Sequence, residues 1–281
     1  MIYTFEERST DAYLCFVLKD KADGRAVYQR RASAIYTIAY NNGPDQEVLI
    51  DGSTYVFAAD HLLPLMSDNH FTFSKPEQII AWQYNREFYC ILDHDKEVSC
   101  AGFLYYGTHG EMFIKLEESD KKKVDALSQV FVDEFSEQDN IQGQMLRMLL
   151  TRLIILTTRL AKKQHVSAEL DEPQFDIARQ FGLLVEEHYK EHHQVQDYAT
   201  LMHKSPKTLS NLFAKFSNKS PLQIILDRVA LEAKRLLLYT DLTSKEIAFE
   251  LGFDDPSTFS RFFKKQVGQS PSAFKKSHKA D

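Results

Sequence analysis

The chain has 281 residues, 43% of them hydrophobic, and a formal net charge of −6. This length and composition allow two domains with apolar cores, and they exclude a disordered or low-complexity protein. The three cysteines form no C-x-x-C pair, which argues against a disulfide framework or a zinc cluster and favours a reducing compartment.

The beginning of the chain lacks the features of an export signal. Residues 1–10 carry acidic side chains where a signal peptide needs a basic start and an apolar run. No stretch approaches the roughly 18 consecutive apolar residues of a membrane-spanning helix. We therefore expect a cytoplasmic protein with no membrane partner.

Residues 1 to about 117 are predicted to form short β-strands, because apolar runs alternate there with turn residues. The dipeptide Asp51-Gly52 separates two such runs and suits a hairpin turn with positive backbone angles. A β-barrel or sandwich follows from this pattern. Further expected strands are Tyr13–Leu18, Ile35–Tyr40, Ile79–Gln83 and Phe88–Leu92.

Two side-chain types in this region could serve a site. The histidines at 61, 70, 94 and 109 form no H-x-H pair, so we expect no catalytic residue, metal or cofactor here. The aromatic residues fit either a small-molecule cavity or ordinary packing of a β core, and packing is the more common role. They include Tyr36, Trp82, Tyr84, Phe88, Tyr89, Tyr105 and Tyr106.

A helical region is predicted for residues 121–165, beginning with the solvated run Lys121–Lys123. Its second half carries leucines at spacings of three and four, which indicates a helix that packs on a partner helix. This predicts a dimer interface, although the same leucines can pack on their own barrel. The stripe consists of Leu146, Leu149, Leu153, Leu156 and Leu160.

Residues 169–173 are predicted to link a domain of residues 1–168 to one of residues 174–281. The second domain holds 16 Lys and Arg against 13 Asp and Glu, whereas residues 1–173 hold 18 against 27. An acidic partner therefore suits the second domain.

Three histidines lie near the start of the second domain. His188 falls on an apolar helical stripe and is assigned to the core, and His192 and His193 are assigned to a helix end.

The second domain contains an internal repeat. Residues 206–215 (PKTLSNLFAK) align with residues 256–265 (PSTFSRFFKK) at an offset of 50. Upstream, Tyr198-Ala199 aligns with Ile247-Ala248 at an offset of 49, so the second copy has one extra residue in its turn. The sequence therefore predicts two copies of one helical unit.

Four dipeptides predict helix starts, because a side-chain oxygen can cap the first amides and proline suits the first helical position. Thr243 with Glu246 predicts a capping box, and Gly252 the end of that helix. Each unit is thus helix, turn, helix. The four dipeptides are Ser205-Pro206, Ser220-Pro221, Asp255-Pro256 and Ser270-Pro271.

In the second helix of each unit, apolar residues recur every three or four positions and form a core stripe. The outward faces contain no acid and suit a major groove. The connector Pro221 to Leu238, as a helix of roughly 27 Å, could place both helices in successive grooves roughly 34 Å apart. A helical bundle with merely solvated basic faces is the alternative, which the repetition disfavours. The outward residues are Lys207, Ser210, Asn211, Ala214 and Lys215, then Ser257, Arg261, Lys264 and Lys265.

Residues 242–274, LTSKEIAFELGFDDPSTFSRFFKKQVGQSPSAF, resemble the signature of AraC/XylS-type bacterial transcription regulators. The resemblance covers residues 175–276 and implies seven helices. Asn218 stands where the first unit of such regulators usually has glycine. Ser210 and Asn211 are shorter than the side chains common at their positions. Arg261, in the second unit, is therefore the best candidate for a base contact. The candidate DNA-binding residues are Lys207, Thr208, Ser210, Asn211, Lys215, Ser257, Thr258, Arg261, Lys264 and Lys265.

The expected fold is α+β, with an N-terminal barrel or sandwich that the resemblance implies to be cupin-like, a helical dimerisation segment, and an all-α double helix-turn-helix domain. The resemblance implies an activator that binds double-stranded DNA, with RNA polymerase and a small-molecule effector as possible partners, and the leucine stripe predicts a dimer. Two alternatives remain open: a ligand-independent dimeric regulator, and a barrel enzyme fused to a DNA-binding domain.

Overall fold

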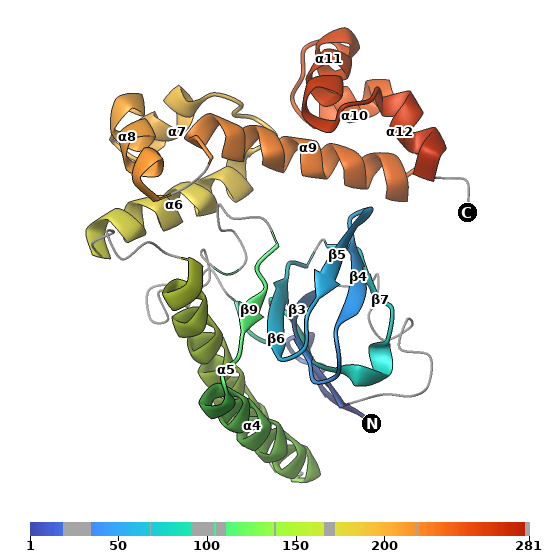
Figure 1. The fold of residues 1–281 in the computed structure, drawn as a ribbon, viewed down its shortest axis with the longest axis vertical. Helices are drawn as coiled ribbons and strands as arrows, with labels where there is room; N and C mark the ends of the chain where they lie inside the picture. Colours follow the sequence, from blue (N-terminus) through green and yellow to red (C-terminus); the bar gives the residue numbers. More distant parts are fainter. Residues whose placement is uncertain are drawn as a thin grey trace. The chain divides into compact units, whose positions relative to one another are not determined.

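The computed structural model describes residues 1–18, 35–67, 69–90, 104, 111–137, 139–165, 172–216 and 219–278. The chain divides into two compact units (Figure 1). The N-terminal unit comprises residues 1–105 and 109–166, and the C-terminal unit comprises residues 106–108 and 167–281. Each unit is described separately.

The N-terminal unit contains two antiparallel sheets, which confirms the expected barrel or sandwich class. One has the order β1-β2-β8-β3-β6-β9 and the other the order β5-β4-β7. Apolar side chains of both sheets form one core, which includes Val48 and Ile50 of β4 together with Ala39 and Ala81 of the larger sheet. The strands are β1 Ile2–Glu7, β2 Ala12–Leu18, β3 Ile35–Asn41, β4 Gln46–Ile50, β5 Ser53–Phe57, β6 His61–Leu65, β7 Phe71–Phe73, β8 Ile79–Asn85 and β9 Ile114–Lys115.

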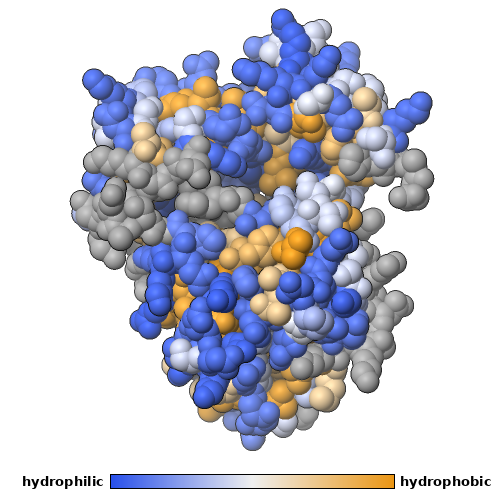
Figure 2. Space-filling view, in the orientation of Figure 1, coloured by the Kyte–Doolittle hydropathy of each residue, from blue (hydrophilic) through white to orange (hydrophobic). Residues whose placement is uncertain are grey.

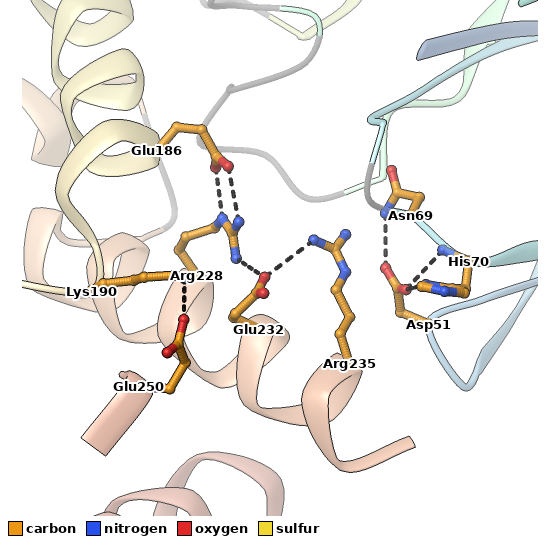
Figure 3. A network of polar contacts seen from close by, with 9 residues as sticks. All are labelled: Asp51, Asn69, His70, Glu186, Lys190, Arg228, Glu232, Arg235 and Glu250. Atoms are coloured by element: carbon orange, nitrogen blue, oxygen red, sulfur yellow. Dashed lines mark hydrogen bonds and ion pairs between the residues drawn. The ribbon is translucent and has the colours of Figure 1, made fainter. Parts of the chain in front are cut away.

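The hairpin between β4 and β5 has the expected turn. Asp51 and Gly52 adopt φ of 47° and 79°, the positive angles that such a two-residue turn requires. The buried Asp51 carboxylate accepts hydrogen bonds from Asn69 Nδ2 at 2.8 Å and from the His70 amide at 3.0 Å. Asp51, Asn69 and His70 are drawn in Figure 3.

The expected strand Phe88–Leu92 is wrong in its described part. The Asn85 side chain accepts a hydrogen bond from the Phe88 amide at 3.0 Å, and the Tyr89 amide donates to the Asn85 carbonyl at 3.1 Å. These bonds close a turn after β8, so Phe88 and Tyr89 are buried by packing and not by strand pairing. Leu92 lies outside the described residues.

Two helices complete the N-terminal unit: α4 Glu118–Ser136 and α5 Gln142–His165. Phe131 of α4 stacks on Phe16 of β2, at 5.5 Å between ring centroids, and Trp82 of β8 lies 6.0 Å away. The described aromatic candidates for a cavity, residues 36, 82, 84, 88 and 89, are likewise buried in packing, and residues 105 and 106 lie outside the described part. Lys121 pairs with Asp60 at 3.0 Å, so this end of the expected solvated run is anchored.

The leucine stripe of α5 is directed largely inward. Leu146, Leu153 and Leu160 are buried within their own chain, and Leu149 and Leu156 are half-buried. Three of the five leucines that were expected to contact a second copy are therefore inaccessible to it. The stripe as a whole is not a dimer surface. Periodicity identified the buried face, but not the neighbour that covers it.

The C-terminal unit is helical, and all four Ser-Pro or Asp-Pro dipeptides open helices as expected. Glu172 and Pro173 belong to α6, and the other residues of the expected linker, 169–171, lie outside the described part. No helix in the described ranges combines the length and apolarity needed to cross a bilayer. The helices are α6 Glu172–His188, α7 Val195–Leu201, α8 Pro206–Phe216, α9 Pro221–Tyr239, α10 Ser244–Glu250, α11 Pro256–Val267 and α12 Pro271–His278.

Candidate nucleic-acid interface

The first helix-turn-helix module consists of α7 and α8. Ser205 Oγ accepts a hydrogen bond from the Thr208 amide at 3.0 Å and caps α8. Leu209 and Phe213 are fully buried, with Phe213 edge-on to Phe181 of α6 at 5.0 Å. Burial of this stripe leaves the opposite face of α8 in solvent. Its exposed residues are Lys207, Thr208, Ser210, Asn211 and Ala214, and the side chain of Lys215 lies outside the described part.

The second module consists of α10 and α11. Thr243 and Glu246 form the expected capping box of α10, and Asp255 caps α11 by accepting hydrogen bonds from the Ser257 and Thr258 amides at 2.8 and 2.9 Å. Hydrogen bonds from the side chain and amide of Thr258 hold the pKa of the Asp255 carboxyl below its usual value. The exposed residues of α11 are Ser257, Thr258, Arg261, Lys264 and Lys265.

Arg261 is held along the surface of α11, since its Nη2 lies 3.3 Å from Thr258 Oγ1. Phe259 and Phe263 are fully buried on the opposite side of the same helix. Figure 2 shows hydrophilic side chains projecting from the part of the surface formed by α10–α12. Arg261 and Asn211 are thus both exposed, as a pair of base-reading side chains requires.

The two turns close in the same way. The Lys204 amide donates to the Ala199 carbonyl at 2.8 Å, and the Phe253 amide donates to the Ala248 carbonyl at 2.9 Å. His203 and Gly252 occupy the equivalent left-handed position, with φ of 52° and 74°. Asp254 is then the extra residue that the repeat predicted in the second turn.

Helix α9 joins the modules (Figure 1). Ile225 belongs to the core of the first module, whereas Val229, Ala233 and Leu237 belong to the core of the second. A helix of its 19 residues is about 28 Å long. One continuous helix therefore takes part in both cores, which fixes the two modules to each other.

Sequence reasoning missed an ion network between α6 and α9 (Figure 3). The guanidinium of Arg228 contacts both carboxylate oxygens of Glu186, at 2.6 and 2.9 Å, and Glu232 at 3.0 Å. It also stacks over the ring of Tyr189, at 3.9 Å from the centroid. Arg228 is one of the buried residues of α9, next to Val229 of the second core. A charged residue at an apolar position of a helix is the sequence signal that could have revealed this network.

A second contact was also missed: the segment after α6 touches the turn of the second module. Lys190 Nζ pairs with Glu250 at 2.6 Å, and the ring of His193 lies 4.9 Å from that of Phe253. A Cβ at Gly252 would lie 2.0 Å from the carbonyl oxygen of Lys190. The glycine thus permits a close backbone approach as well as a positive φ.

The family match falls within this unit. Residues 198–277 match a family described as a helix-turn-helix domain. The uncharacterized HTH-type transcriptional regulator YobQ of Bacillus subtilis is 32% identical over 91 residues, which cover 32% of this chain and 38% of YobQ. The arabinose operon regulatory protein of Salmonella typhimurium is 34% identical over 112 residues, which cover 40% of this chain and 34% of that protein. The chain thus spans about a third of the length of these curated relatives.

A solved structure of ToxT from Vibrio cholerae aligns with 100% of this chain and 97% of its own, at 13% identity and a TM-score of 0.43. The match to the helix-turn-helix family lies within the C-terminal unit, where both helix-turn-helix modules lie.

Proposed function

Because residues 198–277 match a helix-turn-helix family and the chain is similar to the arabinose operon regulatory protein, we propose that this chain is an AraC-type, sequence-specific DNA-binding transcription regulator. The observation that carries the proposal is the pair of exposed, acid-free faces on α8 and α11, fixed to each other by α9. The names of the relatives, which are regulators, support a regulatory and not a catalytic role.

The side chains divide into two roles. Arg261 can donate two hydrogen bonds to a guanine edge in the major groove, and Asn211 can bond an adenine edge. Lys264 suits the phosphate backbone, as do Lys207 and the small hydroxyl side chains. Base contacts specify the site, whereas phosphate contacts fix the position of the protein.

We propose that the chain is an activator, because the regulators that it resembles commonly activate transcription. Transcription by RNA polymerase from a bound promoter, measured with and without the chain, would establish the sign of regulation.

The proposal is tested with a duplex first selected from a random pool by the full chain. Arg261→Ala is expected to weaken binding to the selected duplex by about 5- to 150-fold, because about 1–3 kcal/mol of base discrimination is lost. Binding to random DNA should change little. Affinities are measured by fluorescence anisotropy over a range of salt concentrations.

Lys264→Ala on the same exposed face of α11 is the matched control. It should weaken binding to both duplexes alike and reduce the salt slope by about one. Equal loss on both duplexes for Arg261→Ala would remove Arg261 from base readout. Failure of the full chain to enrich any duplex would overturn the function itself.

For the N-terminal unit we propose homodimerisation through the first half of α5. Met145 and Met148 of α5 are exposed, as is Ile141 directly before the helix, and their spacings of four and three place them on one face. A second copy of α5 could cover this stripe. A small molecule retained by the purified protein would support effector sensing by this unit in addition to dimerisation.

Met148→Glu is expected to shift the chain from dimer towards monomer by at least about tenfold in dissociation constant, because a charge would be placed in an apolar interface. Val56→Glu is the control, since Val56 is equally exposed but lies in β5. Analytical ultracentrifugation measures both. A wild-type chain that sediments as a monomer, or equal effects of both variants, would contradict the proposed surface.

A further inference from the structure

Three side chains with metal-binding atoms meet at the C-terminal end of α6. One ligand atom each of His188, Glu191 and His192 lies within 4.8 Å of the others. The ring centroids of the two histidines are 5.6 Å apart. This is the one such group within the described ranges, and none of its residues belongs to α8 or α11.

The local backbone brings these residues together. Although α6 ends at His188, the His192 amide still donates to the His188 carbonyl at 2.9 Å, so the chain continues for one more helical turn. The two histidines are therefore an i, i+4 pair on one face. The sequence assigned His188 to the core, but its side chain is 26% exposed and turns towards His192.

We propose that His188, Glu191 and His192 bind one Zn²⁺ ion. Two imidazoles at i, i+4 and a carboxylate form a donor set typical of zinc, whereas calcium and magnesium prefer oxygen ligands throughout. Ligand atoms around zinc lie roughly 3.3 Å apart, given bond lengths of about 2.0–2.1 Å. Glu191 is exposed, so its side chain can move the remaining distance. Three protein ligands leave a fourth position for water.

The surroundings hold this turn in place. The hydroxyl of Tyr198, a fully buried residue of α7, donates to the His192 carbonyl at 2.9 Å, and its ring lies edge-on to that of His192. Glu187 lies 3.8 Å from His188 Nε2 and can orient that ring or compete for it. A bound ion would therefore stiffen the segment that leads from α6 to α7. The carbonyl of Lys190, in this segment, lies against Gly252.

Zinc binding is measured on the full chain after chelator treatment, by isothermal titration with Zn²⁺ alone and by the visible absorption of added Co²⁺. We expect one ion per chain. Glu191→Gln should weaken binding about tenfold or more, and His188→Gln combined with His192→Gln should abolish it. Because Glu191 is exposed, its replacement leaves the fold intact even if the double variant does not fold.

His203→Asn is the matched control, because His203 is an exposed histidine of the same unit outside the cluster and asparagine tolerates its left-handed backbone. It should bind zinc like the wild type. Absence of saturable binding by the wild type, or equal affinity in the wild type and Glu191→Gln, would overturn the site. No DNA is present, so the outcome is independent of the proposed regulatory function.

Discussion

Gly252→Ala is expected to destabilise the C-terminal unit by about 2–5 kcal/mol, because two separate penalties combine. The left-handed backbone, with φ of 74°, disfavours any residue with a Cβ. The added methyl would also lie 2.0 Å from the Lys190 carbonyl oxygen. That oxygen belongs to backbone next to Tyr189, which is buried in the core of the second module, so it cannot retreat freely.

Gly268→Ala separates the two penalties. Gly268 ends α11 with φ of 86°, but a Cβ there would meet nothing within 4 Å. This control should lose only the backbone part, about 1–2 kcal/mol. Gly252→Ala should in addition weaken DNA binding, since displacement of the turn moves α11.

Urea unfolding of the full chain followed by far-UV circular dichroism measures these losses. The single tryptophan, Trp82, lies in the N-terminal unit, so its fluorescence provides an internal reference that neither variant should shift. Equal losses at Gly252 and Gly268 would mean that the carbonyl contact is relieved without cost. A shift of the Trp82 transition would mean that the two units unfold together.

Local signals in the sequence predicted the helical unit well. Capping at Ser205, Thr243 and Asp255 depends on neighbouring residues, and all three caps form as expected. The solvent-facing residues of α8 and α11 followed from the apolar stripe opposite them. Even the extra residue in the second turn was visible in the change of offset between the repeats.

Contacts between distant segments were not predictable in the same way. The leucines of α5 had the right period for a buried face, but period alone does not distinguish a partner chain from the chain's own N-terminal unit. The turn after β8 depends on the Asn85 side chain, which competes with strand pairing. The approach of Lys190 to Gly252 spans about sixty residues of sequence and leaves no local pattern.

The ion network of Arg228 is such a contact, and Arg228→Ala is expected to destabilise the C-terminal unit by about 3–5 kcal/mol. The side chain is only 9% exposed, and it satisfies Glu186 and Glu232 at once. Its removal leaves the largely buried Glu186 carboxylate without this cation, leaves Glu232 with Arg235 alone at 3.7 Å, and removes the stacking over Tyr189. The same urea unfolding, followed by circular dichroism, measures the loss.

Lys190→Ala serves as the control for an ion pair in the same region, because Lys190 and Glu250 are 45% and 48% exposed. Exposed pairs of this kind contribute about 0–1 kcal/mol, so this variant should remain close to the wild type. Neutralising Arg228 and Glu186 together, with Arg228→Met and Glu186→Gln combined, should recover much of the loss, since Glu186 then carries no charge and Glu232 still pairs with Arg235 at 3.7 Å. If this double variant is as unstable as Arg228→Ala, the penalty arises from lost packing around Tyr189 and not from uncompensated charge.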